Sequence, residues 1–284
     1  MKEETTYGHQ ELINQAIDYI HTHLHQTLSS EMLAMEMNMS IYHFHRLFKS
    51  YLQETISAYI TRQRMERAVM YLQTRDLSLQ ELSEKVGYDT PQSFSKAFKR
   101  YFGFSPIAFR NTLPLVTTET TMAEDLSSIG LQEPEELLLP TMHVAYIRII
   151  GPYGEEESYE CGWGSLCDFL KEHTLQSPAT RWFGISFDDP MVTQKKRCRF
   201  YACASVPQKI KPSGAIGSLT IENGSYVVYT YRGSYKGLLR AYTHIYSKEK
   251  ERLRNALSFE EYVRWSKESS EQITKIYIPI RLNQ

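Results

Sequence analysis

Residues 78–110 read SLQELSEKVGYDTPQSFSKAFKRYFGFSPIAFR and carry the clearest structural pattern of the chain. Ser78 followed by Glu81 is a capping box that opens a short helix. Gly87 marks a tight turn, because glycine tolerates left-handed backbone. Thr90-Pro91 then opens a second helix with a hydroxyl cap and a proline in the first turn. The stretch therefore predicts two short helices joined by a turn, followed by a third short helix.

The second of these helices separates its side chains onto two sides. One side is apolar, with Phe94, Ala97, Phe98 and Tyr101. The outward side carries Gln92, Ser93, Lys96 and Lys99. Amides, hydroxyls and lysines are suited to base edges and phosphates in a DNA major groove, which favours a helix-turn-helix motif. The alternative is an ordinary helical bundle with a solvated polar face.

The same layout occurs earlier in the chain. Residues 29–51, SSEMLAMEMNMSIYHFHRLFKSY, place Asn38-Met39-Ser40 where the later motif has Tyr88-Asp89-Thr90. Residues 57–74 lie between the motifs without Gly or Pro and predict one continuous helix. At 1.5 Å per residue this helix spans roughly 27 Å, close to the roughly 34 Å between successive major grooves on one face of DNA. Two recognition helices on one rigid spacer are therefore expected to read adjacent grooves.

Composition limits the function without deciding it. At about 150 residues per domain, the 284 residues predict two domains. The formal net charge is −1, and the first 110 residues carry 12 Lys and Arg against 12 Asp and Glu. DNA binding must therefore depend on local clusters of basic side chains. The chain has no long apolar run and no signal peptide, so we expect a soluble, cytoplasmic protein.

Neither the cysteines nor the histidines predict a metal site. Cys161, Cys167, Cys198 and Cys203 include no C-x-x-C pair and are expected to pack as small apolar residues. His21 and His25 can share a helix face, but no third ligand has a supporting spacing. The sequence therefore predicts neither a metal nor another cofactor.

Residues 9–110 resemble the DNA-binding domain of the AraC/XylS family of bacterial transcription regulators. The resemblance rests on Gly87-Tyr88, Ser93-Phe94-Ser95, Phe98-Lys99, Phe102-Gly103, Ser105-Pro106 and Arg110, and on the earlier run His43 to Lys49 with Leu33-Ala34, Tyr59-Ile60 and Arg64. It implies base contacts from Tyr42, His45 and Arg46 in the first recognition helix and from Gln92, Ser93 and Lys96 in the second. Lys99 belongs to the basic cluster expected at the phosphates. The implied partners are promoter DNA and RNA polymerase.

One segment departs from that family. At Gln53-Glu54-Thr55-Ile56 the family usually has Gly and Pro. The turn into the linking helix is therefore expected to differ, and with it the relative angle of the two motifs.

The C-terminal half alternates strands and helices. Residues 143–150 and 226–232 alternate as strands, and each ends at a Gly-x-Tyr turn, Gly151-Pro152-Tyr153 and Gly233-Ser234-Tyr235. Helical stretches follow at 157–172 and 236–247, so strand, turn and helix occur twice. This recurrence predicts an internally duplicated α+β domain; the alternative is two unrelated strand-to-helix turns. Further strands are predicted at 182–187, 199–206 and 275–281.

The predicted chain is thus multidomain. An all-α tandem helix-turn-helix domain spans residues 1–110, residues 111–135 form a Thr-, Ser- and Glu-rich linker or edge strand, and an α+β domain spans residues 136–284.

Aromatic residues crowd the second domain, and most are expected to be core. A cleft that combines aromatic rings with a carboxylate would bind lipophilic cations, because ring faces and the carboxylate both attract positive charge. The candidate carboxylates are Glu260 and Glu261, placed just before the final strand. The candidate aromatic residues are Tyr153, Trp163, Trp182 and Tyr231.

Residues 136–284 resemble the GyrI-like effector-binding domain. The carrying features are Tyr146-Ile147-Arg148, Gly151-Pro152-Tyr153, Trp163, Phe187 to Pro190, Cys198 to Tyr201, Ala204, Gly233-Ser234-Tyr235, Glu260-Glu261-Tyr262 and Tyr277 to Ile280. The resemblance implies that hydrophobic or cationic small molecules bind beside a glutamate among aromatic residues. By its E-x-Y spacing Glu260 matches that glutamate best, and Glu261 remains the alternative.

The leading interpretation is a ligand-responsive, non-enzymatic transcriptional activator. Two alternatives remain open. Some GyrI-like proteins hydrolyse reactive small molecules with such a glutamate, and Glu260 would then act as a general base with a pKa raised by burial. The other alternative is a regulator whose second domain binds no ligand.

Overall fold

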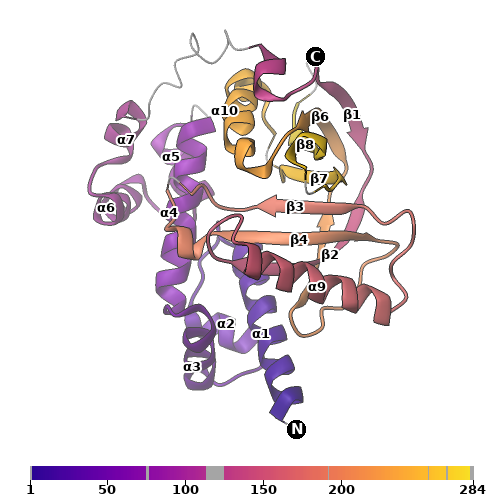
Figure 1. Ribbon diagram of the computed structural model, residues 1–284. Helices are drawn as coiled ribbons and strands as arrows, with labels where there is room; N and C mark the ends of the chain where they lie inside the picture. The colour runs from indigo at the N-terminus through magenta and orange to yellow at the C-terminus, as the bar shows by residue number, and fades with distance from the viewer. Residues whose placement is uncertain are drawn as a thin grey trace. The chain divides into compact units, whose positions relative to one another are not determined.

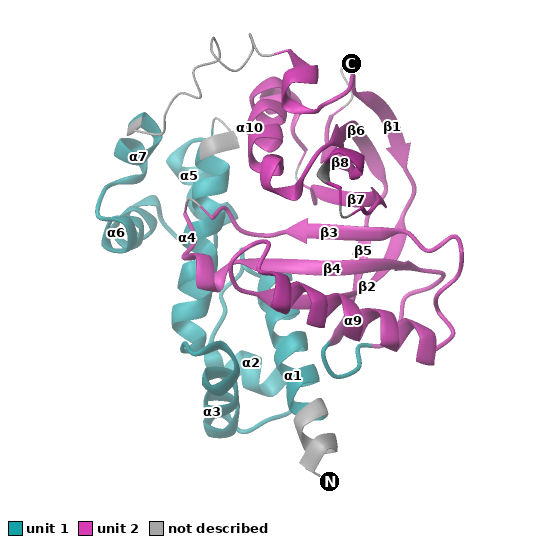
Figure 2. Ribbon diagram, in the orientation of Figure 1, with its two compact units in different colours: residues 1–114, 212–215 teal, residues 115–211, 216–284 magenta. Residues whose placement is uncertain are grey.

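The computed structural model describes residues 2–74, 77–112, 125–190, 192–254, 256–266 and 268–281. Among the described residues of 2–112, all regular secondary structure is helical. Figure 2 shows the division of the chain into two units, residues 1–114 with 212–215 and residues 115–211 with 216–284.

The first unit consists of α1 (Lys2–Thr22), α2 (Ser30–Glu36), α3 (Ile41–Leu52), α4 (Ile56–Thr74), α5 (Leu79–Lys85), α6 (Pro91–Phe102) and α7 (Pro106–Thr112). Figure 1 shows α2 and α3 beside one end of α4, with α5, α6 and α7 near its other end. The predicted linking helix is thus confirmed as α4. The predicted duplicated helix pairs are α2 with α3 and α5 with α6.

Each helix pair has apolar residues to bury. Phe44 and Phe48 of α3 are fully buried in a cluster with residues of α1, α2 and the start of α4. In α6, Phe94 and Phe98 are buried in the same way. The α6 side chains then continue into stacked rings, because Phe102 lies 5.8 Å from Phe109 of α7 between ring centroids. The apolar residues that recur at helical spacing in the sequence therefore face the core in both motifs.

The second unit begins with a short 3-10 helix, η1 (Leu126–Ile129), and contains an antiparallel sheet. The elements are β1 (Glu135–Leu139), β2 (Met142–Ile150), α9 (Glu156–Glu172), β3 (Trp182–Ser186), β4 (Arg199–Val206), β5 (Ile216–Ile221), β6 (Gly224–Arg232), α10 (Leu238–Glu249), β7 (Phe259–Arg264) and β8 (Ile273–Pro279). Short 3-10 helices η2 (Lys195–Arg197), η3 (Tyr235–Gly237), η4 (Lys250–Arg252) and η5 (Ser269–Glu271) lie in the connections. In the described residues the strands form one eight-stranded sheet in the order β1-β6-β8-β7-β3-β4-β2-β5.

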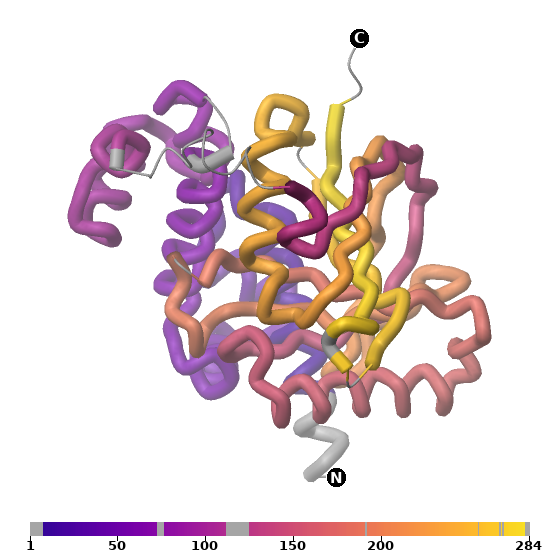
Figure 3. The backbone as a smooth tube through the Cα atoms, turned by 45° about the horizontal axis from the view of Figure 1, so that its top comes forward, coloured from indigo at the N-terminus to yellow at the C-terminus, as the bar shows by residue number. Residues whose placement is uncertain are grey.

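The sheet is built from two similar halves. The first runs β1, β2, α9, β3, β4 and the second runs β5, β6, α10, β7, β8. The outermost strands are exchanged, because β1 pairs with β6 and β5 pairs with β2. Figure 3 shows β1 and β6 side by side although they are far apart in sequence. This architecture agrees with the predicted duplication, including the turns at Gly151 and Gly233, where φ is +154° and +148°.

The structure adds two strands that the sequence did not predict, β5 and β7, and it decides between the linker and edge-strand readings at β1. β1 begins in the stretch read as linker or edge strand, and it is an edge strand of the sheet. β5 is short and contains Gly217 and Ser218, which weakens the apolar signal. β7 contains the Glu260-Glu261 pair that was placed before the final strand. Of the predicted linker, residues 113–124 lie outside the described part of the chain.

The two halves meet at the centre of the sheet, where β3 pairs with β7. Side chains alternate between the two faces of each strand. One face holds a core cluster with Ile276 and Ile278 of β8 beneath α10. The other face holds a separate cluster with Phe183, Tyr201 and Phe259. Of the candidate effector residues, Glu260, Trp163 and Trp182 come together at the helix-covered face of the central β3–β7 pair.

Candidate functional site

The first helix-turn-helix motif presents its predicted DNA-contacting side chains outward. The Ser29 and Ser40 hydroxyls accept backbone hydrogen bonds at the starts of α2 and α3. This capping fixes where α3 begins. Tyr42 is 75% exposed, Arg46 is exposed, and His45 is half-buried.

The second motif has the same construction. Ser78 and Glu81 form the predicted capping box, and Thr90 caps α6 with Pro91 in the first turn. Gln92, Lys96 and Lys99 are exposed on the outward side of α6. Ser93 is also exposed, but its hydroxyl lies 2.8 Å from the carbonyl oxygen of Thr90 and donates to it. The Ser93 side chain therefore takes part in the cap.

The segment that departs from the AraC/XylS pattern forms a well-defined turn. Gln53 adopts the left-handed conformation, with φ of +55°, and caps the end of α3. The Thr55 hydroxyl accepts a hydrogen bond from the Ala58 amide at the start of α4. Glu54 is buried and forms an ion pair with Arg62 at 2.6 Å. The turn into α4 is therefore built here by Gln53, Glu54 and Thr55.

In the second unit, Glu260 lies on β7 opposite Gly184 of β3, at the meeting of the two halves. Only 4% of the Glu260 surface is exposed. Its carboxylate accepts hydrogen bonds from Tyr262 at 2.8 Å and from Tyr242 of α10 at 3.1 Å. Among the described residues no cation is paired with it. Burial therefore dominates, and it raises the pKa of Glu260 to about 7 although both hydroxyls favour the charged form.

Aromatic rings surround this carboxylate. Trp163 of α9 lies 5.8 Å from Tyr262 and 6.1 Å from Trp182 between ring centroids. Tyr235, which is 36% exposed, meets the edge of Tyr262 at 5.4 Å. We call Glu260, Tyr242, Tyr262, Trp163, Trp182 and Tyr235 the Glu260 cluster. Burial, and then the charge of Glu260, raise the pKa of Tyr235, Tyr242 and Tyr262, as expected for hydroxyls close to a carboxylate.

Gly184 leaves room for this arrangement. A Cβ atom at Gly184 would lie 2.1 Å from the Tyr262 hydroxyl oxygen and 2.7 Å from the Phe200 ring. Neither distance is possible without displacing a ring. The absence of a side chain at Gly184 therefore allows Tyr262 to reach Glu260.

Glu261 has a different environment because alternation turns it to the opposite face. It forms a bidentate ion pair with Arg181 at 2.7 and 2.8 Å and accepts a hydrogen bond from Tyr277 at 2.6 Å. Burial raises the pKa of Glu261, but these partners outweigh burial, and the net pKa is lowered. Glu261 thus already has its cation, whereas Glu260 has none among the described side chains.

The structure brings together Glu260, Trp163 and Trp182 but places Tyr153 and Tyr231 in other contacts. The Tyr153 hydroxyl accepts from the Asp188 amide at 3.0 Å and lies 2.9 Å from the Asp188 carbonyl oxygen. It ties the turn after β2 to the chain after β3. Tyr231 is buried in the core under α10, and its hydroxyl donates to the Ser234 carbonyl.

Sequence reasoning did not select Tyr242, Tyr262 or Tyr235 as site residues. The E-x-Y spacing was a signal for Tyr262, which lies two residues from Glu260 on β7 and therefore on the same face. Tyr242 was not detectable, because only the sheet order and the packing of α10 bring it to β7.

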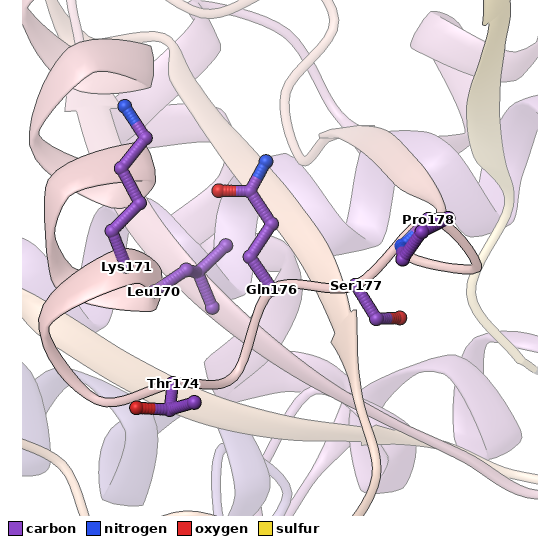
Figure 4. Close-up of a pocket in the computed structure, with 6 residues that line it drawn as sticks. All are labelled: Leu170, Lys171, Thr174, Gln176, Ser177 and Pro178. Carbon is purple, nitrogen blue, oxygen red and sulfur yellow. The ribbon is translucent and has the colours of Figure 1, made fainter.

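Figure 4 shows a separate surface hollow of about 460 Å³ at the end of α9. It is lined by Leu170, Lys171, Thr174, Gln176, Ser177 and Pro178. This lining has neither a carboxylate nor an aromatic ring. The Glu260 cluster therefore suits a lipophilic cation better than this hollow does.

The described residues contain no group of three His, Cys, Asp or Glu side chains arranged to hold a metal ion. They also contain no helix long and apolar enough to cross a membrane.

The GyrI-like small molecule binding domain matches residues 132–281, more than half of the chain, and a helix-turn-helix domain matches residues 33–112. The transcriptional regulator Rob of Salmonella typhimurium is 23% identical over 238 residues, 78% of this chain and 78% of that protein. The regulator AlkR of Acinetobacter baylyi is 40% identical over 106 residues, 37% of this chain and 34% of that protein.

Among solved structures, the C-terminal domain of AraT, a response regulator from Geobacillus stearothermophilus, is 36% identical with a TM-score of 0.35. The match covers 36% of this chain and 84% of that one. Because the GyrI-like domain match covers more than half of the chain, the chain belongs to the family of GyrI-like small molecule binding domains, and it carries an AraC-type helix-turn-helix domain ahead of that domain.

Proposed function

We propose that this chain is a transcriptional activator that binds promoter DNA through both helix-turn-helix motifs and responds to a cationic, lipophilic small molecule bound at the Glu260 cluster. The two domain matches support this pairing of activities. The exposed side chains of Arg46 and Lys96 support DNA binding, because Arg46 lies on the outward side of α3 and Lys96 on the outward side of α6.

The main support for ligand binding at the Glu260 cluster is the environment of Glu260. A buried carboxylate without a cation is unfavourable, and a ligand that brings the positive charge removes that cost. The rings of Trp163 and Tyr262 attract the same charge. A cation with aromatic or alkyl groups meets both requirements, whereas an anion meets neither.

The direct test measures ligand binding by the full-length protein. Isothermal titration calorimetry at pH 8 compares tetraphenylphosphonium with neutral triphenylphosphine oxide. We expect Glu260→Gln to weaken the cation at least about tenfold, equal to about 1.4 kcal/mol, because the counter-charge is lost. The neutral compound should change by less than about twofold.

The matched control is Glu261→Gln, which makes the same chemical change one residue along β7. Because Arg181 already neutralises Glu261, this variant should bind the cation within about twofold of the wild type. Weaker cation binding in Glu261→Gln alone would assign the site to Glu261. Unchanged binding in both variants would contradict a carboxylate site at β7.

One observation favours a second function. A carboxyl group whose pKa is about 7 is suited to act as a general base near neutral pH. Glu260 would then take a proton from water as the water adds to an ester carbonyl and the alcohol leaves. Rhodamine 6G, a cationic ethyl ester, tests this: hydrolysis lost in Glu260→Gln would support the enzyme, and quantitative recovery of the intact dye supports the regulator.

A further inference from the structure

The two helix-turn-helix motifs have separate cores and share α4. The buried cluster of the first motif takes its α4 residues from Ile56, Tyr59 and Ile60. Further along α4, Met65, Ala68 and Val69 are buried outside that cluster. The separation and relative rotation of the two recognition helices therefore depend on the stiffness of α4 and on the contacts that join the two motifs near the middle of α4.

Arg64 lies at that middle. Its Nε donates to the Leu24 carbonyl oxygen at 3.2 Å, and its Nη2 donates to the Gln26 carbonyl oxygen at 2.7 Å. Both carbonyls belong to the chain that leaves α1, within the first motif. A guanidinium group can bind two acceptors at once because its donors form a planar fork.

The same guanidinium group also contacts the second motif. Its central carbon lies 5.4 Å from the centroid of the Tyr88 ring, in the turn between α5 and α6. Tyr88 in turn packs against Phe94 of α6 at 5.7 Å between ring centroids. Arg64 therefore links the end of α1 to the start of the second recognition helix.

Gly87 allows this close junction. Its φ is +79°, and a Cβ atom there would lie 2.3 Å from the Leu24 carbonyl oxygen and 2.7 Å from Arg64 Nη2. The turn of the second motif thus sits directly against the backbone of the first, with no space for a side chain.

We infer that Arg64 is a positioning residue that fixes the separation and relative rotation of α3 and α6, so that the protein reads its two DNA elements at one spacing only. The inference rests on the proposed DNA-binding function. A bend of about 20° at the middle of α4, about 14 Å from its end, moves that end by about 5 Å. That displacement exceeds the rise of one base pair, about 3.4 Å. A junction that prevents such bending therefore sets the spacing.

The experiment first selects a binding site from random DNA with the full-length protein. It then inserts or deletes one base pair between the two elements and measures Kd by fluorescence anisotropy. We expect the wild type to lose about a hundredfold in affinity on the altered spacings. Arg64→Ala should lose about tenfold on the selected site, while its penalty for altered spacing falls below about threefold.

Two comparisons separate positioning from folding. Arg67→Ala removes a neighbouring donor to the His21 carbonyl of α1 and should keep the wild-type spacing penalty. Arg64→Lys keeps the charge without the fork and should behave like Arg64→Ala. On probes with a single DNA element, Arg64→Ala should bind like the wild type.

The outcomes are distinguishable. An unchanged spacing penalty in Arg64→Ala, an equal loss on single-element probes, or a selected site with only one element would each overturn this inference and leave the proposed function standing. Failure of the wild type to select any sequence would overturn the proposed function itself.

Discussion

Burial raises the pKa of Glu260 to about 7, above the ordinary value for a glutamate. At pH values between the ordinary pKa and the raised pKa, the folded protein keeps a proton on Glu260 that the unfolded chain has lost. The free energy of unfolding therefore decreases as pH rises through this range. The effect should be about 3 kcal/mol for a shift of this size. Glutamine does not titrate, so Glu260→Gln should not lose this stability. We predict that the difference in free energy of unfolding, Glu260→Gln minus wild type, rises by about that much from pH 5 to pH 8.

Tryptophan fluorescence during urea unfolding measures this directly. All three tryptophans, Trp163, Trp182 and Trp265, lie in the second unit, so the signal reports the unit that contains Glu260. Parallel pH profiles for the wild type and Glu260→Gln would show that the carboxyl group titrates normally.

Gln53 holds a left-handed conformation that most side chains avoid. Gln53→Gly should therefore raise the free energy of unfolding of the first unit by about 0.5–1 kcal/mol, although it removes the hydrogen bond from Gln53 Nε2 to the Ser50 carbonyl. Circular dichroism at 222 nm during thermal unfolding follows these helices. Gln53→Ala is the control, because it loses the amide but keeps the strain, and it should be less stable than Gln53→Gly.

The residues of the candidate site differ in how far the sequence could predict them. The E-x-Y spacing singled out Glu260, and strand alternation explains why Glu260 and Tyr262 share a face. The environment that distinguishes Glu260 from Glu261 was not predictable, since Arg181 and Tyr242 reach β7 only through the sheet order. Tyr231 looked like a site aromatic, yet its place in the core under α10 is set by tertiary packing.

The recognition helices α3 and α6 are expected to contribute sequence-specific contacts. Arg46→Ala and Lys96→Ala should each lose about 1–3 kcal/mol on the selected DNA site, and less on random DNA. Lys85→Ala is the control, because Lys85 is also an exposed cation but lies on α5. Fluorescence anisotropy at fixed salt gives the affinities. Equal losses on selected and random DNA would mean that these side chains bind phosphates only.

Local signals predicted the helices of the first unit well, since caps such as Ser78 and Thr90 act within a few residues. Strands rich in β-branched and aromatic residues, such as β2 and β6, were predicted for the same reason. β5 and β7 were not predicted, because their pairing with β2 and with β3 and β8 is long-range. Their own residues include glycine, serine and adjacent charges, which give a weak strand signal.

The chain as a whole joins an AraC-type helix-turn-helix unit to a GyrI-like unit, which we propose read DNA and bind the ligand respectively. If the ligand changes the affinity for DNA by some factor, DNA must change the affinity for the ligand by the same factor. We therefore predict that tetraphenylphosphonium binds with a different Kd when the protein is saturated with its selected DNA. Calorimetry on the free protein and on the complex provides the comparison. A truncated chain that begins at residue 125 should show no effect of DNA.

The most direct test of ligand-responsive DNA binding measures the DNA affinity of the full-length wild type and of Glu260→Gln, each with and without saturating tetraphenylphosphonium. The account predicts that the cation changes the wild-type Kd for the selected DNA by at least about fivefold and leaves that of Glu260→Gln unchanged. An identical wild-type Kd with the cation bound, or the same change in Glu260→Gln, would contradict it.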